Sequence, residues 1–252
     1  MANVRALVIA VGGSVSVALV ANGQPIFFDD HMLFTQHAEG QDKTMKFLED
    51  FEESTVGQGQ KIPFPNSLQH GVPRPTFDNG INATNLVIQT NVTPGPTPLT
   101  PNPSASQTAL WVNGPGFLGS NSVKVGTDEF LTNDFSSIDL IFTTDDKTAI
   151  ALDVSTYPGF NQGHGGFIFS VYDLNDVVLG TYLMPGPTPT EPAKNFFGVW
   201  SATPIGRVNV WGIFAAPQPF AVDNIEMWSN IPAPGSAVVL GLSALAWARR
   251  RR

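Results

Sequence analysis

The chain has 252 residues, with 24 Gly, 21 Pro, 18 Phe and 5 Trp but only 13% charged residues and no Cys. This length suits one domain with short appendages, and the composition favours an all-β domain over a helical bundle. The absence of Cys excludes disulfides and thiolate metal sites. Residues 22–230 hold 8 basic and 21 acidic residues, so this part carries a net charge of −13, which disfavours nucleic-acid binding and suits divalent cations.

The first segment has the layout of a secretory signal peptide. Arg5 precedes a continuous apolar stretch that ends in small residues. We therefore expect a signal helix over residues 1–21, cleaved after Ala18 or Ala21, and a protein that is exported through the inner membrane. A buried first strand or an uncleaved anchor is the alternative.

Residues 22–45 show no clean period and are expected to be an irregular segment with one short helix or strand at most. A β domain over residues 46–230 follows, in which short apolar runs are separated by Gly, Pro, Asn or Asp. The expected strands cover residues 46–53, 85–90, 109–113, 122–125, 137–144, 149–155, 167–173, 177–183, 196–201, 207–213 and 222–228.

Several of these runs alternate as the strands of a half-buried sheet do. In residues 137–144, Ile138, Leu140 and Phe142 share one face, whereas Asp139 and Ile141 share the other. About ten such strands predict a β-sandwich of jelly-roll-like type. A parallel β-helix is the competing architecture, but no repeat of fixed period is visible.

The C-terminal segment, residues 231–252, combines a proline motif, an apolar run and a basic end. The apolar run over residues 236–248 would span about 20 Å as a helix, which is short for a hydrocarbon core of about 30 Å. Basic residues after it would stay on the cytoplasmic side of the membrane. The motif is formed by Pro232, Ala233 and Pro234, and the basic end by Arg249, Arg250, Arg251 and Arg252.

This arrangement resembles the PEP-CTERM sorting signal of bacterial exported proteins, although Ala233 stands where that family most often has Glu. The resemblance implies a short C-terminal transmembrane sorting helix that pauses in the inner membrane. It also implies an exosortase-type transpeptidase that cuts near the proline motif and passes the body to the cell surface or extracellular matrix. A tail that only anchors the protein is the alternative.

Two stretches of the body, LEDFEES from residue 48 and VDNI from residue 222, resemble the opening and closing strands of jelly-roll carbohydrate-binding modules. In such modules a calcium ion ties the first strand to the last. The resemblance implies a structural Ca²⁺ held by Glu52 and Asp223, with Asp50 and Glu53 as further ligands. Solvated surface carboxylates are the competing interpretation.

The aromatic and histidine residues leave their roles open. Five aromatic side chains are candidates for stacking on sugar rings, although a Trp within a strand is more often part of the core. They are Trp111, Tyr157, Trp200, Trp211 and Trp228. His31 and His37 lie near two aspartates and could begin a metal site, but we expect them to be solvent-exposed.

No catalytic motif is present in the sequence, so no catalytic residue is predicted. The favoured hypothesis is an exported, surface-sorted protein of the envelope or extracellular matrix that is not an enzyme, with a binding or structural β-sandwich. Extracellular polysaccharide is its candidate partner. An enzyme acting on polysaccharide, with an active site assembled from distant residues, is the alternative. A structural module without a small ligand is the third.

Overall fold

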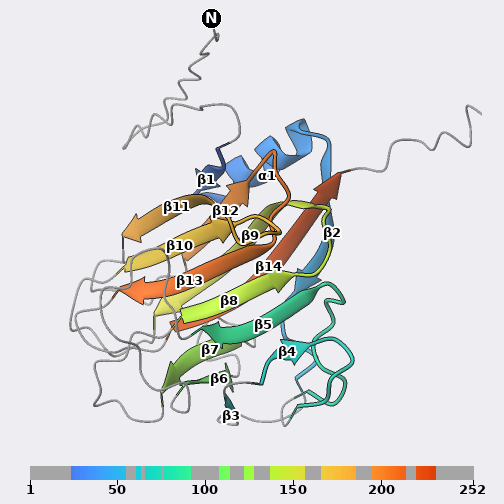
Figure 1. Ribbon diagram of the computed structural model, residues 1–252, viewed down its shortest axis with the longest axis vertical. Coiled ribbons are helices and arrows are strands. Elements are labelled where there is room, and N and C mark those ends of the chain that lie inside the picture. Colours follow the sequence, from blue (N-terminus) through green and yellow to red (C-terminus); the bar gives the residue numbers. More distant parts are fainter. Residues whose placement is uncertain are drawn as a thin grey trace, which may run out of the picture.

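The chain folds into two antiparallel sheets that pack face to face, so the predicted β-sandwich is confirmed (Figure 1). The computed structural model describes residues 24–54, 61–63, 66–74, 77–91, 108–113, 122–127, 137–156, 166–185, 195–213 and 220–230. Every pair of named strands is antiparallel, which excludes the parallel β-helix for these residues. From β7 onward the chain crosses between the sheets at nearly every connection, as expected for the predicted jelly-roll-like arrangement.

The first sheet has eight strands, and its long central strands are β9 and β14. β2 lies beside β14 at one end of that strand, and β7 pairs with its other end. The strands in spatial order are β1 (Ile26–Phe28), β12 (Asn195–Trp200), β9 (Lys147–Thr156), β14 (Phe220–Asn230), β7 (Ser122–Thr127), β6 (Thr108–Asn113) and β3 (Lys61–Pro63), with β2 (Lys43–Glu49) off this path.

The second sheet has six strands and faces the viewer in Figure 1. Its edges are a long strand, β11, and a very short one, β4. In spatial order the strands are β11 (Val178–Pro185), β10 (Gly166–Tyr172), β13 (Arg207–Ile213), β8 (Ser137–Phe142), β5 (Leu86–Asn91) and β4 (Leu68–Gln69).

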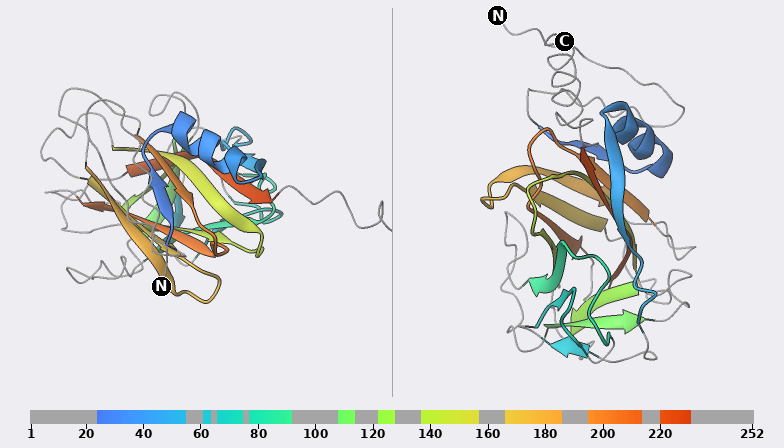
Figure 2. Two further views of the ribbon diagram at one scale, coloured as in Figure 1. Left: turned by 90° about the horizontal axis from the view of Figure 1, so that it is seen from above. Right: turned by 90° about the vertical axis from the view of Figure 1, so that its right-hand side faces the viewer.

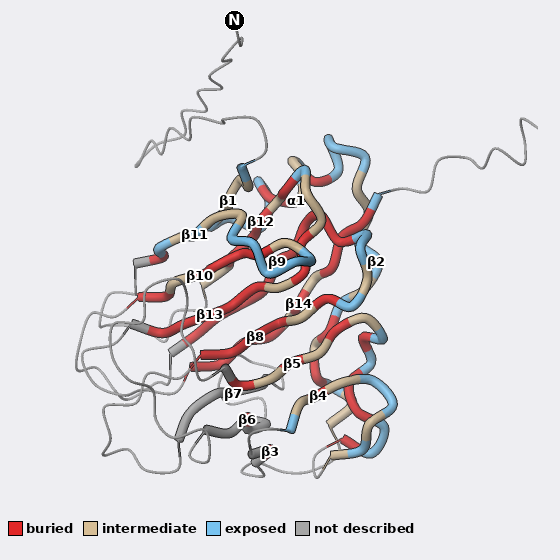
Figure 3. The backbone as a smooth tube through the Cα atoms, viewed as in Figure 1, coloured by how far each residue is buried: buried red, intermediate tan, exposed pale blue. Residues whose placement is uncertain are grey.

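The core lies between the sheets and is built by the alternation that the sequence shows. Ile138, Leu140 and Phe142 of β8 are buried in it, as predicted, because alternate side chains of a strand point to the same face. Phe169 of β10 and Phe197 of β12 stack across the sandwich with ring centroids 3.8 Å apart. Figure 3 shows the central strands of both sheets as the most buried part of the backbone.

A helix, α1 (His31–Gly40), covers the outer face of the eight-stranded sheet (Figure 2). Asp30 caps its N-terminus by accepting a hydrogen bond from the N–H of Leu33 at 2.9 Å. Phe34 and Ala38 pack against alanines of β9 and against Trp228. Where the sequence predicts an irregular segment, the structure therefore has β1, α1 and the start of β2, all built onto the sandwich.

The two proposed targeting segments lie outside the described residues, so the expected signal helix and sorting helix have no structural description. In the part of the chain that is described, no helix combines the length and apolar character needed to cross a membrane.

Candidate functional site

A row of polar residues runs across the outer face of the six-stranded sheet. Directly opposed residues in the strand register share a face, and the register joins one residue from each of five strands. This polar row consists of Gln89, Asp139, Asn209, Ser170 and Thr181. Its centre is buried, whereas Gln89 is half-buried and Thr181 is exposed.

A pocket of about 440 Å³ opens beside the Gln89 end of the polar row. β5, β8 and the start of β13 form its floor, and the turn between β10 and β11 forms one wall. Its polar lining residues are Gln89, Asp139, Asp173, Asp176 and Arg207, and its apolar lining includes Ile141 and Leu174. We call this the Arg207 pocket, because the guanidinium lies at the junction of floor and wall.

Arg207 is fixed by three contacts. Its Nη1 donates to Asp139 Oδ1 at 3.0 Å, its Nε donates to Asp176 Oδ1 at 2.9 Å, and its guanidinium carbon lies 3.8 Å from the ring centroid of Tyr172. Burial alone would lower the pKa of Arg207, but the charge of Asp139 and the hydrogen bonds to both aspartates outweigh burial and raise it. The guanidinium is therefore a permanently charged, rigid donor group.

The turn that forms the wall is held by its own hydrogen bonds. Asp173 Oδ1 accepts from the backbone N–H of Asn175 at 2.8 Å and of Val177 at 2.9 Å. Gly206 lets this turn approach β13, since a Cβ at that position would lie 2.5 Å from the carbonyl oxygen of Asp173. The position of Asp176 over the pocket thus depends on a glycine thirty residues further along the chain.

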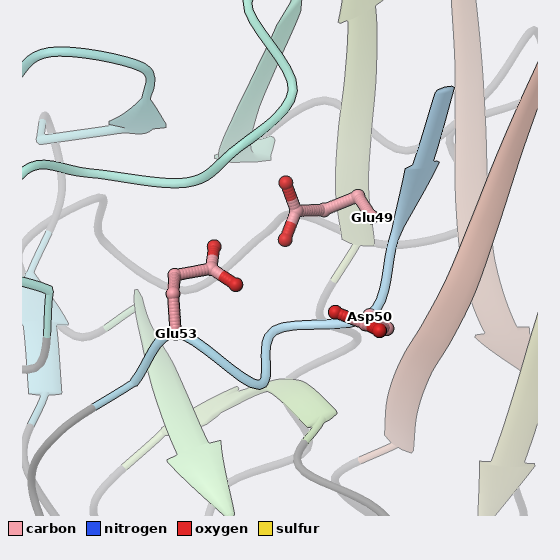
Figure 4. A group of neighbouring side chains, drawn as sticks. All are labelled: Glu49, Asp50 and Glu53. Carbon is pink, nitrogen blue, oxygen red and sulfur yellow. The ribbon is translucent and has the colours of Figure 1, made fainter. Parts of the chain in front are cut away.

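A second polar feature is an acidic cluster where β2 ends. Carboxylate oxygens of Glu49, Asp50 and Glu53 lie within 4.8 Å of one another. In Figure 4 the carboxylates of Glu49 and Glu53 point toward one another. Glu49 is buried, and it accepts hydrogen bonds from the backbone N–H of Ala83 at 2.8 Å and of Phe51 at 3.1 Å.

Ionisation of the Glu49 carboxyl group is disfavoured by its surroundings. Burial raises the pKa of Glu49 to about 8, with further contributions from its hydrogen bond with Glu53 and from the charge of Glu53. Two carboxylates so close together need a shared proton or a cation between them. The cluster can therefore act as an oxygen-only cation site, the donor set that Ca²⁺ prefers.

Of the four carboxylates that the resemblance implied as metal ligands, Asp50 and Glu53 belong to this cluster, whereas Glu52 and Asp223 do not. Glu52 is exposed on the turn after β2, and its backbone N–H donates to Asp50 Oδ1 at 3.3 Å. Asp223 is buried on β14, where it accepts from the N–H of Asn224 at 2.7 Å. β2 does pair with β14, up to Ile225 opposite Glu49. Glu49 is the member of the cluster that sequence reasoning did not name as a ligand, and in the described chain this is the one group of three or more such side chains close enough to share an ion.

The histidines of α1 are placed by aromatic contacts. His37 is half-buried between Phe28 and Trp200, and burial lowers the pKa of His37. His31 is exposed, as expected, and its Nε2 lies at hydrogen-bond distance, 2.8 Å, from Glu226 Oε1, a contact that joins the helix to β14. The neighbouring Asp30 serves as the helix cap, so these residues build the fold rather than a metal centre.

Two of the aromatic candidates are resolved as buried. Trp228 packs in the cluster beneath α1, and Trp211 is 1% exposed on β13. Trp200 is half-buried beside His37. Tyr157 and the side chain of Trp111 lie outside the described residues. The aromatic ring that contacts the Arg207 guanidinium is Tyr172, which sequence reasoning did not single out.

Comparisons with known proteins give no family for this chain. No protein-family model matches it, and no curated protein sequence matches it. Similar solved structures include the CBM22-1 xylan-binding domain of Paenibacillus barcinonensis Xyn10C, which has 10% sequence identity to this chain and a TM-score of 0.34. The alignment covers 76% of this chain and 97% of that chain.

Two further structures show similarity of the same order. The K2 cleaved adhesin domain of Lys-gingipain has 16% identity, coverage of 75% of this chain and 98% of that chain, and a TM-score of 0.38. A family 11 carbohydrate-binding module from Clostridium thermocellum, in complex with a mixed-linked tetrasaccharide, has 10% identity, coverage of 71% and 100%, and a TM-score of 0.33. Similarity at this level assigns neither a family nor a ligand.

Proposed function

We propose that this protein is an exported, non-catalytic β-sandwich that binds neutral polysaccharide in the Arg207 pocket. The observation that carries the proposal is the pocket itself, in which carboxylate, amide and guanidinium groups surround a cavity of about 440 Å³. This volume lies in the range of small-ligand sites. Sugar hydroxyls both donate and accept hydrogen bonds, so they match a lining that offers acceptors and donors together.

The charge of the lining favours neutral over anionic glycans. Asp139, Asp173 and Asp176 face one cation, Arg207, which two of them already neutralise. A uronate or sulfate group would therefore meet net negative charge in the pocket and across the anionic body. Leu174, 47% exposed, and Ile141 add apolar surface for the C–H face of a sugar ring.

A binding role also agrees with the state of the pocket carboxylates. Asp139 accepts from Arg207 and Asn209, and Asp173 accepts from two backbone groups of its own turn. Carboxylates fixed in this way are suited to orienting a ligand, whereas a general acid or base must exchange its proton with the substrate.

An affinity-electrophoresis series tests the proposal. The protein should be retarded by one or more neutral polysaccharides, and Gln89→Ala should weaken that retardation, because it removes a half-buried amide from the pocket lining. Gln36→Ala, on the exposed side of α1, is the matched control and should bind as the unmodified protein does. Equal binding by both variants would place the ligand elsewhere, and preference for acidic polysaccharide would overturn the charge argument.

We infer the export and sorting route from the two ends of the chain. The signal-peptide layout of residues 1–21 supports export, and the motif Pro232, Ala233 and Pro234 with its basic end supports processing by an exosortase-type enzyme. The mature protein then resides at the cell surface or in the extracellular matrix, where polysaccharide is accessible.

We further propose that a structural Ca²⁺ binds where β2 meets β14. The resemblance implies Glu52 and Asp223 with Asp50 and Glu53 at this junction, and the geometry adds Glu49 as a ligand. An ion that binds only the native state stabilises it by about 2.7 kcal/mol at a hundredfold excess over Kd.

Melting curves measured in calcium and in chelator test whether Ca²⁺ binds to the folded protein and stabilises it. The melting temperature should rise in calcium, and Glu53→Gln should remove that rise. Asp145→Ala, which changes an exposed carboxylate outside the cluster, should retain it. Identical curves for the unmodified protein in calcium and chelator would exclude a structural ion.

A further inference from the structure

The edge strands of the sandwich differ in how they are protected. An edge strand presents unpaired backbone groups, and proteins usually shield them with short strands or with charged side chains. β1 and β3 have three residues each and β4 has two. β2 has seven residues and carries Lys43 and Lys46.

β11 lacks both kinds of protection. It has eight residues, VLGTYLMP, none of them charged, and among the described strands it pairs with β10 alone. It forms the upper left edge of the six-stranded sheet in Figure 1. Of the edge strands that the structure describes, β11 is thus the long one without a charge.

Exposed apolar side chains concentrate on this edge. Val178 and Leu183 of β11 are 43% and 63% exposed, and Leu174 and Val177 of the adjoining turn are 47% and 58% exposed. These four make up half of the eight large apolar side chains that are exposed in the described residues. Exposed apolar side chains gathered on one edge of a sheet indicate an interaction surface.

We propose that β11 pairs antiparallel with β11 of a second copy of the chain, so that the protein is a two-fold symmetric dimer with one continuous sheet. A partner for an uncharged, apolar edge must itself be uncharged and apolar, and β11 meets that requirement. The remaining body has a net charge of −13, so contact through another face would bring like charges together.

The side-chain directions restrict the register of this pairing, because opposed residues must point to the same face, and we take the register centred on Tyr182. Thr181 and Leu183 lie opposite Ser170 and Ile168 of β10, so both point to the outer face, whereas Tyr182 points inward and stacks on Phe27. Faces match when Thr181 lies opposite the partner's Leu183, which places Tyr182 at the two-fold axis. Each exposed Leu183 is then covered by a neighbouring strand.

The pairing has a consequence that rests on the proposed function. A two-fold axis between antiparallel edge strands runs perpendicular to the sheet, so the outer faces of both sheets lie on the same side. Two Arg207 pockets would then face one polysaccharide chain, and binding at one would raise the effective concentration at the other.

Sedimentation velocity without glycan tests the dimer independently of ligand binding. The purified unmodified protein should have twice the monomer mass. Leu183→Lys should be monomeric, because it places a charge on the paired edge, while Leu48→Lys, at an exposed leucine of β2, should remain dimeric. A monomeric unmodified protein, or a dimer that survives Leu183→Lys, would overturn the proposal and leave β11 to another partner.

Cross-linking tests the register, since the chain has no cysteine of its own. Oxidation of a mixture of Thr181→Cys and Leu183→Cys proteins should yield a disulfide-linked dimer. A mixture of Thr181→Cys with Leu48→Cys should not. Cross-linking in the second mixture alone would show that β11 of one copy meets β2 of another, and would contradict the pairing of β11 with β11.

Discussion

The buried carboxyl of Glu49 makes the stability of the protein depend on pH in an unusual direction. The pKa of Glu49 is raised from 4.5 to about 8, so the folded state holds a proton that the unfolded chain releases. Stability from this group is fully present below pH 4.5 and is lost as pH rises through 8. A tenfold difference in the acid dissociation constant of Glu49 between the folded and unfolded states corresponds to about 1.36 kcal/mol. The free energy of unfolding should therefore fall by roughly 5 kcal/mol across this pH range.

Thermal melting without calcium, followed from pH 5 to pH 9, measures this loss. At roughly 2 to 4 °C per kcal/mol, the melting temperature should fall by about 10 °C or more across the range. Glu49→Gln, which is uncharged at every pH, should flatten the profile and melt above the unmodified protein at pH 9. Glu52→Gln, on the exposed turn nearby, should keep the decline. Parallel profiles for the unmodified protein and Glu49→Gln would refute the reasoning.

Four further predictions concern the pocket and the sorting signal. Arg207→Met should destabilise the protein by on the order of 3 kcal/mol in denaturant unfolding, because it leaves Asp139, 3% exposed, without its cation. Asp176→Asn should cost less than about 1 kcal/mol, since that carboxylate is 72% exposed. Gly206→Ala should cost about 1 to 3 kcal/mol and weaken glycan binding, because its Cβ meets Asp173, whereas Gly40→Ala, with open space around it, should be tolerated. Mass spectrometry of surface material should find peptides of the body but none ending in Arg249, Arg250, Arg251 and Arg252, and an intact tail on the mature surface protein would exclude its removal.

The strands that sequence reasoning located are those whose alternation is strong. The predicted strand over residues 207–213 coincides with β13, and the prediction for residues 137–144 exceeds β8 by two residues. β1, β3 and β4 were missed because two or three residues are too few to show a period. The sequence allowed one short helix or strand in residues 22–45 but did not place α1, because only Phe34 and Ala38 are buried on it and its apolar stripe is weak.

The candidate sites show that the spacing of residues in the sequence does not predict which side chains meet in the fold. Asp139 and Arg207 meet in the pocket although 68 residues separate them, and no local motif connects them. The chain turns at Phe51, whose φ is 57°, and this turn decides which carboxylates of residues 49–53 converge. Glu49 rather than Glu52 therefore faces Glu53, a difference that only the backbone conformation decides.

Chemical-shift mapping by NMR tests the central claim most directly. Titration with a neutral oligosaccharide from a polysaccharide that binds should shift amide signals of β5, β8, β13 and the turn over residues 173–177, with Gln89 and Arg207 among the largest changes. Residues of α1 and of the eight-stranded sheet should remain unshifted. Shifts centred on α1, or on the acidic cluster at the end of β2, would contradict a glycan site in the Arg207 pocket.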